Sequence, residues 1–141
     1  MNNISKYELD TPCLVIDKLK LVANIKAMQK YASSHKKLVR PHAKTHKCTQ
    51  VAKLQLELGA VGICVAKVSE ALEFAKNGIT GLLITSPVVT TIKLNNLAEV
   101  LSLAPDTMVV IDGFDNLKQL SELAQTKNLS PINIIVEIDA G

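Results

Sequence analysis

Short apolar runs recur along this chain at the length of parallel strands, and each run is nearly continuous rather than alternating with polar residues. Continuous runs are typical of strands covered on both faces, whereas alternation is typical of strands with one face in water. The expected strands are residues 37–39, which lead into 40–42, then 61–66, 81–86, 107–112 and 132–139. The earlier segment 11–16 has a similar character and is expected to form a lead-in strand.

Between these runs, apolar residues recur every three or four positions, the spacing that places side chains on one face of a helix. The five helical stripes are Leu21, Val22, Ile25, Met28 and Ala32; Val51, Leu54 and Leu58; Ala71, Leu72 and Ala75; Leu94, Leu97, Ala98 and Leu101; and Leu117, Leu120, Leu123 and Ala124. The expected start signals are Asp17, Ser69, Thr90-Thr91 and Asp115, and the expected stop signals are Gly59 and Asn77-Gly78.

Strands and helices therefore alternate, which predicts an α/β fold with a parallel sheet built from right-handed crossovers. One architecture that fits is a small doubly wound sheet with a ligand crevice at its switch point. The other is the first five strand–helix units of an eight-stranded barrel, a fold of about 250 residues. Only Ala140 and Gly141 follow the last strand, although a buried parallel strand needs a covering helix and a neighbour. Under the barrel interpretation the chain is truncated.

The composition excludes several classes of protein. The 141 residues are 48% hydrophobic and 21% charged, which suits one folded domain and argues against disorder. No apolar run approaches the ~20 residues that a membrane-spanning helix needs. The N-terminal segment lacks the basic start and apolar stretch of a signal peptide, so a cytoplasmic location is expected. The three cysteines have no C-x-x-C spacing, and we expect reduced, mostly buried thiols.

Basic residues are concentrated in the first half of the chain, although the net charge is only +3. Ten lysine or arginine residues and no acidic residue lie between Asp17 and Glu57. Such a stretch could bind nucleic acid, phosphate or a carboxylate substrate, or could be a set of solvated helix lysines. It contains one aromatic residue, Tyr31, and hence no stacking platform for bases. We expect a small-molecule substrate and neither a nucleic-acid nor a membrane partner.

The strongest candidate site is the segment Val39-Arg40-Pro41-His42-Ala43-Lys44-Thr45-His46-Lys47. An abrupt change from apolar to charged residues is costly inside a strand, and Pro41 cannot donate to a central ladder. The polar cluster is therefore expected at the carboxyl end of a strand, where both candidate folds place their sites.

Lys44 is the candidate for covalent chemistry in this segment. Attack on an aldehyde needs a neutral amine, whereas the pKa of a free lysine is about 10.4. Partial burial and nearby cations both favour the neutral form, and Arg40, Lys47 and protonated His42 or His46 would supply the cations. We choose Lys44 over Lys47 because Lys47 is expected in the first turn of the following helix. The alternative is that Lys44 is an ordinary loop lysine.

A metal site in the same segment is a weaker hypothesis. His42, His46 and Cys48 are close in sequence, but they do not have helical spacing, and no further cluster supplies the remaining ligands. We therefore expect no metal ligand in this chain.

Other polar residues end the later strands. Thr85-Ser86-Pro87 would place hydroxyl groups beside a bound ligand, or would serve as ordinary loop residues. Asp112 and Asp139 are expected to act in capping or turns. No glycine-rich phosphate loop is present in the sequence.

Four segments together resemble the D-threonine aldolase / D-serine dehydratase family, whose members are pyridoxal 5'-phosphate enzymes with an alanine-racemase-like fold. They are TPCLVID at 11–17, RPHAKTHK at 40–47, GAVGICVAK at 59–67 and LITSPVV at 83–89. The similarity runs from about residue 8 to the end, and the R-P-H-x-K-T-H-K motif is specific. In the family the first lysine of this motif forms the Schiff base with the cofactor, and the matching residue is Lys44.

The resemblance implies the barrel rather than the doubly wound sheet. Residues 1–141 would be an incomplete cofactor-binding (β/α)8 barrel of the alanine racemase N-terminal type, with the remaining strands and a C-terminal β domain absent. The implied cofactor site comprises Lys44, His42, Arg40, Thr45 and Thr85. The divalent metal of the family, manganese or zinc, would take ligands that this chain does not contain, and the full-length protein would be a homodimer.

The implied activity is that of a lyase on 3-hydroxy-D-amino acids, and we expect the D-threonine aldolase type, which cleaves the substrate to glycine and an aldehyde. The alternatives are a D-serine dehydratase, an amino-acid racemase of the same fold, a non-catalytic protein that holds pyridoxal phosphate, or a remnant that binds nothing. The fragment alone is expected to be inactive.

Overall fold

The computed structural model describes residues 4–141, so the first three residues of the segment considered above for a signal peptide lie outside the described residues. Its centre is a parallel sheet of four strands: β1 (Ile63–Val65), β2 (Leu82–Ile84), β3 (Met108–Ile111) and β4 (Asn133–Val136). The strands are adjacent in chain order, and each pair is parallel. The predicted α/β class and four of the five main strands are confirmed. The order of these strands does not reverse, as it would at the switch point of a doubly wound sheet.

The expected first strand is reduced to a single parallel bridge between His42 and Cys64. The segment still runs beside β1, because the Val61 amide donates to the Val39 carbonyl (3.0 Å) and the Cys64 amide donates to the Pro41 carbonyl (2.8 Å). Pro41 has no N–H to return, so the ladder stays incomplete.

The predicted lead-in strand at 11–16 is wrong. This segment is exposed and forms no strand, and Leu14 in particular is fully solvent-accessible. An apolar run without a neighbouring strand cannot complete a ladder, which explains the failure.

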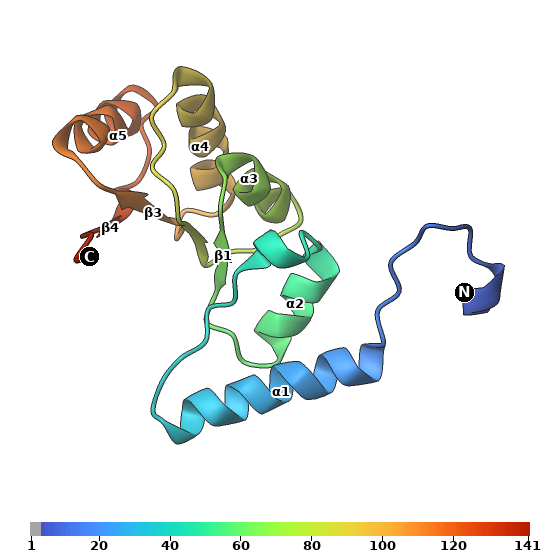
Figure 1. The fold of residues 1–141 in the computed structure, drawn as a ribbon. Coiled ribbons are helices and arrows are strands. Elements are labelled where there is room, and N and C mark those ends of the chain that lie inside the picture. Colours follow the sequence, from blue (N-terminus) through green and yellow to red (C-terminus); the bar gives the residue numbers. More distant parts are fainter. Residues whose placement is uncertain (1–3) are drawn as a thin grey trace.

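Five α-helices and two short 3-10 helices alternate with the strands in the described part of the chain. They are η1 (Lys6–Glu8), α1 (Lys18–Ser34), η2 (Ala43–Thr45), α2 (Thr49–Glu57), α3 (Val68–Lys76), α4 (Thr91–Leu103) and α5 (Phe114–Thr126). Helices α3, α4 and α5 follow one another along the sheet, while α1 lies beside α2, and the N-terminal segment extends away from the rest (Figure 1). No helix within residues 4–141 is long and apolar enough to cross a membrane.

The starts of α3 and α5 differ from their predictions, whereas the capping roles of Asp17 and Thr90 are confirmed. Asp115 is the second residue of α5, whose N-cap is Gly113. The side chains of Asp17 and Thr90 accept backbone N–H bonds at the starts of α1 and α4. Ser69 is the second residue of α3 rather than its N-cap, which is Lys67 and makes no side-chain capping bond. Gly59 and Gly78 follow α2 and α3 with φ of 110° and 76°, values that favour glycine.

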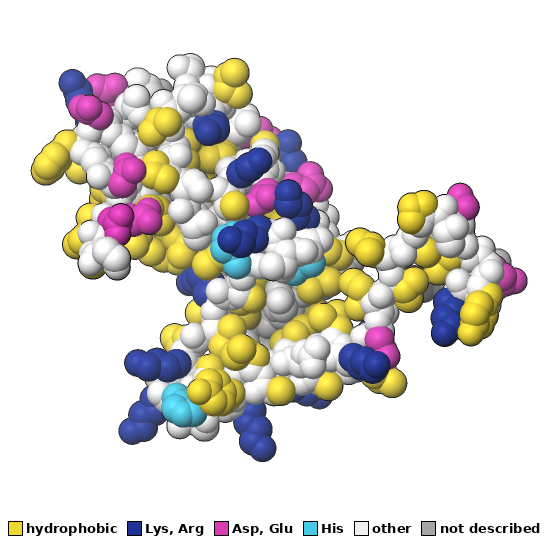
Figure 2. Space-filling model, viewed as in Figure 1, with side chains coloured by type: hydrophobic (Ala, Val, Ile, Leu, Met, Phe, Trp, Pro, Cys, Tyr) yellow, Lys and Arg dark blue, Asp and Glu magenta, His cyan; other side chains and the backbone are white. Residues whose placement is uncertain are grey.

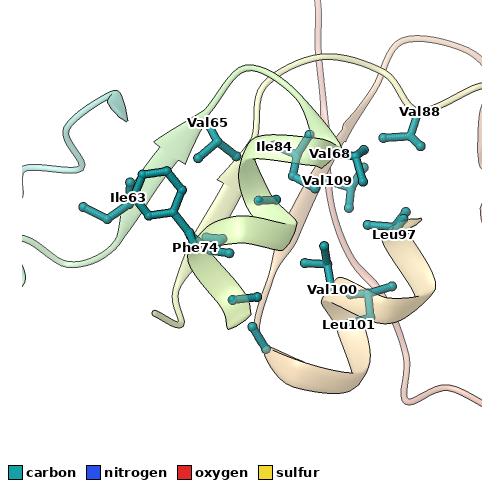
Figure 3. Close-up of a cluster of buried hydrophobic side chains, with 14 of the residues drawn as sticks. Ile63, Val65, Val68, Phe74, Ile84, Val88, Leu97, Val100, Leu101 and Val109 are labelled. Carbon is teal, nitrogen blue, oxygen red and sulfur yellow. The ribbon is translucent and has the colours of Figure 1, made fainter. Parts of the chain in front are cut away.

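The core lies between the sheet and helices α3 and α4. Ile63, Val65 and Ile84 point from the strands towards Phe74 of α3 and Val100 of α4 (Figure 3). Cys64, between two fully buried β1 residues, is only half-buried and belongs to the opposite face of the sheet. The helices therefore cover one face, and the face that carries Cys64 lies away from the core.

The cysteines are less buried than predicted. Cys13 is exposed, Cys48 and Cys64 are half-buried, and all three are free thiols. Cys48 lies at the start of a helix and Cys64 faces away from the core, which is why their apolar character does not lead to full burial.

The two phenylalanines provide a matched test of this core. Phe74 is 2% exposed and Phe114 is 89% exposed. We expect Phe74→Ala to lower the free energy of unfolding by about 3–5 kcal/mol, because it leaves a cavity in the core. Phe114→Ala should change it by less than about 0.5 kcal/mol. Urea unfolding followed by circular dichroism measures both; equal effects would show that the core is not where the structure places it.

Candidate active site

The turn that carries Lys44 leaves the sheet at the carboxyl end of its strands. Helix η2 begins directly after the bridge at His42. Ala43 is 1% exposed and is part of the core, so it anchors the turn, while Lys44 and Thr45 are exposed. The expected position at the end of a strand is therefore observed. The partial burial expected for the Lys44 side chain is not, because a turn that projects from the sheet edge leaves it in solvent.

His42 connects this turn to the end of β2. Its Nδ1 accepts a hydrogen bond from the Lys44 amide (3.2 Å), and its Nε2 lies 3.4 Å from the Thr85 hydroxyl. The Thr85 hydroxyl in turn donates to the Val65 carbonyl (3.1 Å). Because Nδ1 is an acceptor, the ring proton is assigned to Nε2, which then donates to Thr85. Three hydrogen bonds thus link the Lys44 backbone to β1 through a neutral imidazole.

The electrostatics agree with this protonation state. Burial lowers the pKa of His42 below its ordinary value, the charge on Lys44 lowers it further, and the carboxylate of Glu70 opposes both effects. The pKa of His42 stays lowered overall, so the neutral ring is favoured near pH 7.

His46 makes a similar local contact on the other side of the turn. Its Nδ1 accepts from the Cys48 amide (3.0 Å). Burial lowers the pKa of His46, although Gln55 and the Cys48 amide act in the opposite direction. His46 Nε2 and Gln55 Oε1 are both buried without a hydrogen-bond partner, so Gln55 acts by proximity rather than through a well-formed bond. Among residues 4–141 no group of three or more His, Cys, Asp or Glu side chains could hold a metal ion.

Lys47 does not lie in the first turn of the next helix, as the sequence predicted. It precedes α2 by two residues and has a left-handed backbone, with φ of 47°. Its amide donates to the Ala43 carbonyl (2.7 Å), which closes the turn around Lys44. Because Lys47 closes this turn, helix α2 begins only at Thr49.

Glu70, which the sequence analysis did not identify, is the acidic partner of this group. Its Oε1 lies 3.2 Å from Lys47 Nζ, and its Oε2 accepts from the Ala66 amide (2.9 Å). Burial raises the pKa of Glu70, but the Ala66 amide and Lys47 lower it by more, so it is lowered overall. Histidine, lysine and acidic side chains lie together near the middle of the face shown in Figure 2. The available signal was a glutamate three residues after the N-cap of α3, a common capping position.

Arg40 points towards the opposite end of the sheet. Its guanidinium donates to the Gly81 carbonyl, which directly precedes β2. Gly62 provides the necessary space, because a Cβ at that position would overlap the Arg40 guanidinium. Burial raises the pKa of the neighbouring Cys64 thiol, with Arg40 opposing, so this thiol is protonated.

The remaining candidates lie at or near the same edge as Lys44. The Thr45 hydroxyl donates to the His42 carbonyl (3.3 Å). Ser86 lines a cavity of about 340 Å³ between the starts of α3 and α4, together with the exposed lysines Lys67 and Lys93. Asp139 accepts from the Gly141 amide (3.1 Å), which confirms the expected turn role.

Known proteins share both this sequence and this geometry. The sequence profile described as alanine racemase, N-terminal domain, matches residues 16–141. A D-threonine aldolase from Arthrobacter sp is 44% identical over 94% of this chain and 35% of its own length. A 3-hydroxy-D-aspartate aldolase from Paracoccus denitrificans is 42% identical over 98% of this chain and 36% of its own.

Among solved structures, D-threonine aldolase from Filomicrobium marinum superposes with a TM-score of 0.90 at 38% identity. That match covers 96% of this chain and 36% of the other. The chain thus spans about a third of the length of the curated relatives that it matches.

The lowered pKa values of the two histidines predict how stability depends on pH. Between the ordinary and the lowered pKa, the unfolded chain binds more protons than the folded chain at His42 and His46. Stability is therefore complete above about pH 6.5 and falls as the solution becomes more acidic. Urea unfolding from pH 7.5 to 5.0 should show this loss, and His42→Gln should reduce it. His35→Gln, at an exposed histidine, is the control and should leave the slope unchanged.

Proposed function

This chain belongs to the alanine racemase N-terminal domain family, and from that premise we propose that it supplies the cofactor-linking lysine of a pyridoxal-phosphate-dependent lyase. The substrates are 3-hydroxy-D-amino acids, and Lys44 holds the cofactor as a Schiff base. The reaction is the aldolase type, with glycine and an aldehyde as products. The names of the two aldolase relatives support this reaction class.

The observation that carries the proposal is the state of the Lys44 amine compared with its neighbour. A carbonyl cofactor needs an accessible primary amine, and Lys44 is exposed on a turn whose backbone is fixed by His42 and Ala43. The Lys47 amine is instead paired with Glu70. The residues present therefore fit a cofactor that binds through Lys44.

Four further residues are proposed to support the cofactor, each in a different way. His42 holds its proton on Nε2, towards Thr85, and can present its ring face beside the Lys44 turn. The Thr85 hydroxyl orients that ring through its bond to the Val65 carbonyl. Thr45 uses its hydroxyl to hold the turn. Arg40 acts only indirectly: its guanidinium is bonded to Gly81 at the opposite end of the sheet, so it holds the segment that leads into the turn.

Pyridoxal phosphate, when bound, supplies a conjugated ring that withdraws electrons from the substrate α-carbon. The protein's part is to fix the amine that binds it, to keep His42 neutral beside that amine, and to hold the His42 proton at a defined nitrogen. The described residues contain no cluster that could bind a divalent metal. A metal in the full-length protein therefore remains an expectation from the family resemblance.

Cofactor attachment is tested by adding pyridoxal phosphate to the full-length protein and recording the imine absorbance band. We expect the band with the unmodified protein and its loss in Lys44→Ala, because this variant lacks the amine. Lys118→Ala, at an exposed lysine of α5 outside the candidate site, should keep it. Borohydride reduction and peptide mapping should then place the label on Lys44. A band that survives in Lys44→Ala, or a label elsewhere, would refute the proposal.

The reaction class is tested by product analysis of the full-length protein, with and without a chelator, because residues 1–141 alone are expected to be inactive. D-threonine should give glycine and acetaldehyde, and L-threonine should give neither. Pyruvate from D-serine would instead identify a dehydratase, and loss of chirality without cleavage would identify a racemase. Imine formation without any product would support the non-catalytic alternative.

A further inference from the structure

The ion pair between Lys47 and Glu70 joins the Lys44 turn to the first turn of α3. It is one of two ion pairs among residues 4–141, and its carboxylate is the more sheltered one. The Glu70 side chain is 12% exposed and that of Lys47 is 64% exposed, whereas both side chains of the other pair, Lys76 and Glu99, are about half exposed. A sheltered carboxylate is less screened by water and salt than a surface one.

The backbone makes Lys47 the residue that closes the turn. Its amide bonds to the Ala43 carbonyl, and its left-handed φ of 47° is a conformation that lysine rarely adopts unless its surroundings hold it there. The bond from Nζ to Glu70 supplies such a restraint from a different element of the fold. Glu70 is itself fixed, because its second oxygen accepts from the Ala66 amide at the end of β1.

The charges around the turn give the pair a second effect. The charge on Lys44 lowers the pKa of His42, and the Glu70 carboxylate raises it. Glu70 is therefore close enough to act electrostatically on the Lys44 turn. The Glu70 carboxylate forms an ion pair with Lys47, which neutralises its charge beside the turn. Without Lys47, Glu70 would be left as an unpaired anion beside the turn, with the exposed lysines Lys44 and Lys67 as its alternative partners.

We propose that Glu70 and Lys47 are positioning residues for Lys44: their ion pair holds the turn closed and keeps Glu70 from capturing the amine that must bind the cofactor. This inference rests on the proposed role of Lys44. It assigns no contact with cofactor or substrate to either residue.

The two partners should therefore behave unequally when they are removed. Lys47→Met loosens the turn and also frees Glu70, so we expect imine formation with pyridoxal phosphate to slow about 10-fold. Glu70→Gln keeps an acceptor for the Ala66 amide and removes the competing charge, so we expect slowing of about 3-fold. The double variant should resemble Glu70→Gln, so that the second substitution partly rescues the first.

A pH profile separates positioning from a purely structural role. In Lys47→Met the pH of half-maximal imine formation should rise, because an unpaired carboxylate favours the ammonium form. This rise should be absent in Glu70→Gln and in the double variant. Lys47→Arg, which can keep the ion pair, should restore the unmodified rate. Lys76→Met breaks the exposed Lys76–Glu99 pair and is the matched control, with no expected effect.

The outcomes distinguish this inference from the proposed function. If Lys44→Ala keeps the imine band, the proposed role of Lys44 and the positioning role of the ion pair are both refuted. If that band is lost but Lys47→Met matches the unmodified rate and pH profile, only the positioning role is overturned. It is also overturned if Glu70→Gln fails to rescue Lys47→Met, or if both variants lower the melting temperature without a change in imine formation.

Discussion

The parallel bridge between His42 and Cys64 is the interaction on which the candidate site depends. It aligns the segment 39–42 with β1, so the chain reaches the carboxyl edge of the sheet at His42. Pro41 offers no N–H, and pairing on that side ends where η2 begins. Ala43 then enters the core and Lys44 faces solvent. One incomplete strand thus combines a rigid anchor with an exposed amine one residue later, a combination that neither a full strand nor a free loop would provide.

Few charged groups interact with one another at the carboxyl edge of the sheet, where the Lys44 turn lies. Arg40 is directed to the far end of the sheet by the Gly81 carbonyl, which separates it from the lysines of the turn. Glu70 pairs with Lys47 and also contributes to the charge balance at His42. His42 remains neutral and uses both ring nitrogens, one towards the Lys44 backbone and one towards Thr85. The site is therefore organised by directed hydrogen bonds from neutral groups, with a single ion pair beside them whose carboxylate is sheltered.

The sequence was sufficient for features set by local periodicity. Continuous apolar runs located β1 to β4, and capping residues such as Asp17 and Thr90 located helix starts. It failed where contacts between distant segments decide the structure. The run at 11–16 resembles a strand but has no partner, and Lys47 is kept out of helix α2 by turn closure at Ala43. Glu70 could not be connected to Lys47 from sequence, because only the fold brings the start of α3 to the turn.

The choice of Lys44 over Lys47 stays a prediction, and the reason first given for it is wrong. The sequence argument placed Lys47 in a helix, and the structure places it in the turn, only three residues from Lys44. Proximity alone would make the two amines equivalent candidates. What separates them is a carboxylate: Glu70 holds the Lys47 amine at 3.2 Å, whereas the described structure assigns no ion pair to Lys44. Two neighbouring lysines thereby differ in their surroundings: the Lys47 amine is paired with Glu70, and the Lys44 side chain is exposed. Because a fold alone does not determine function, this difference in the state of two identical side chains supports the assignment more strongly than the barrel-type sheet does.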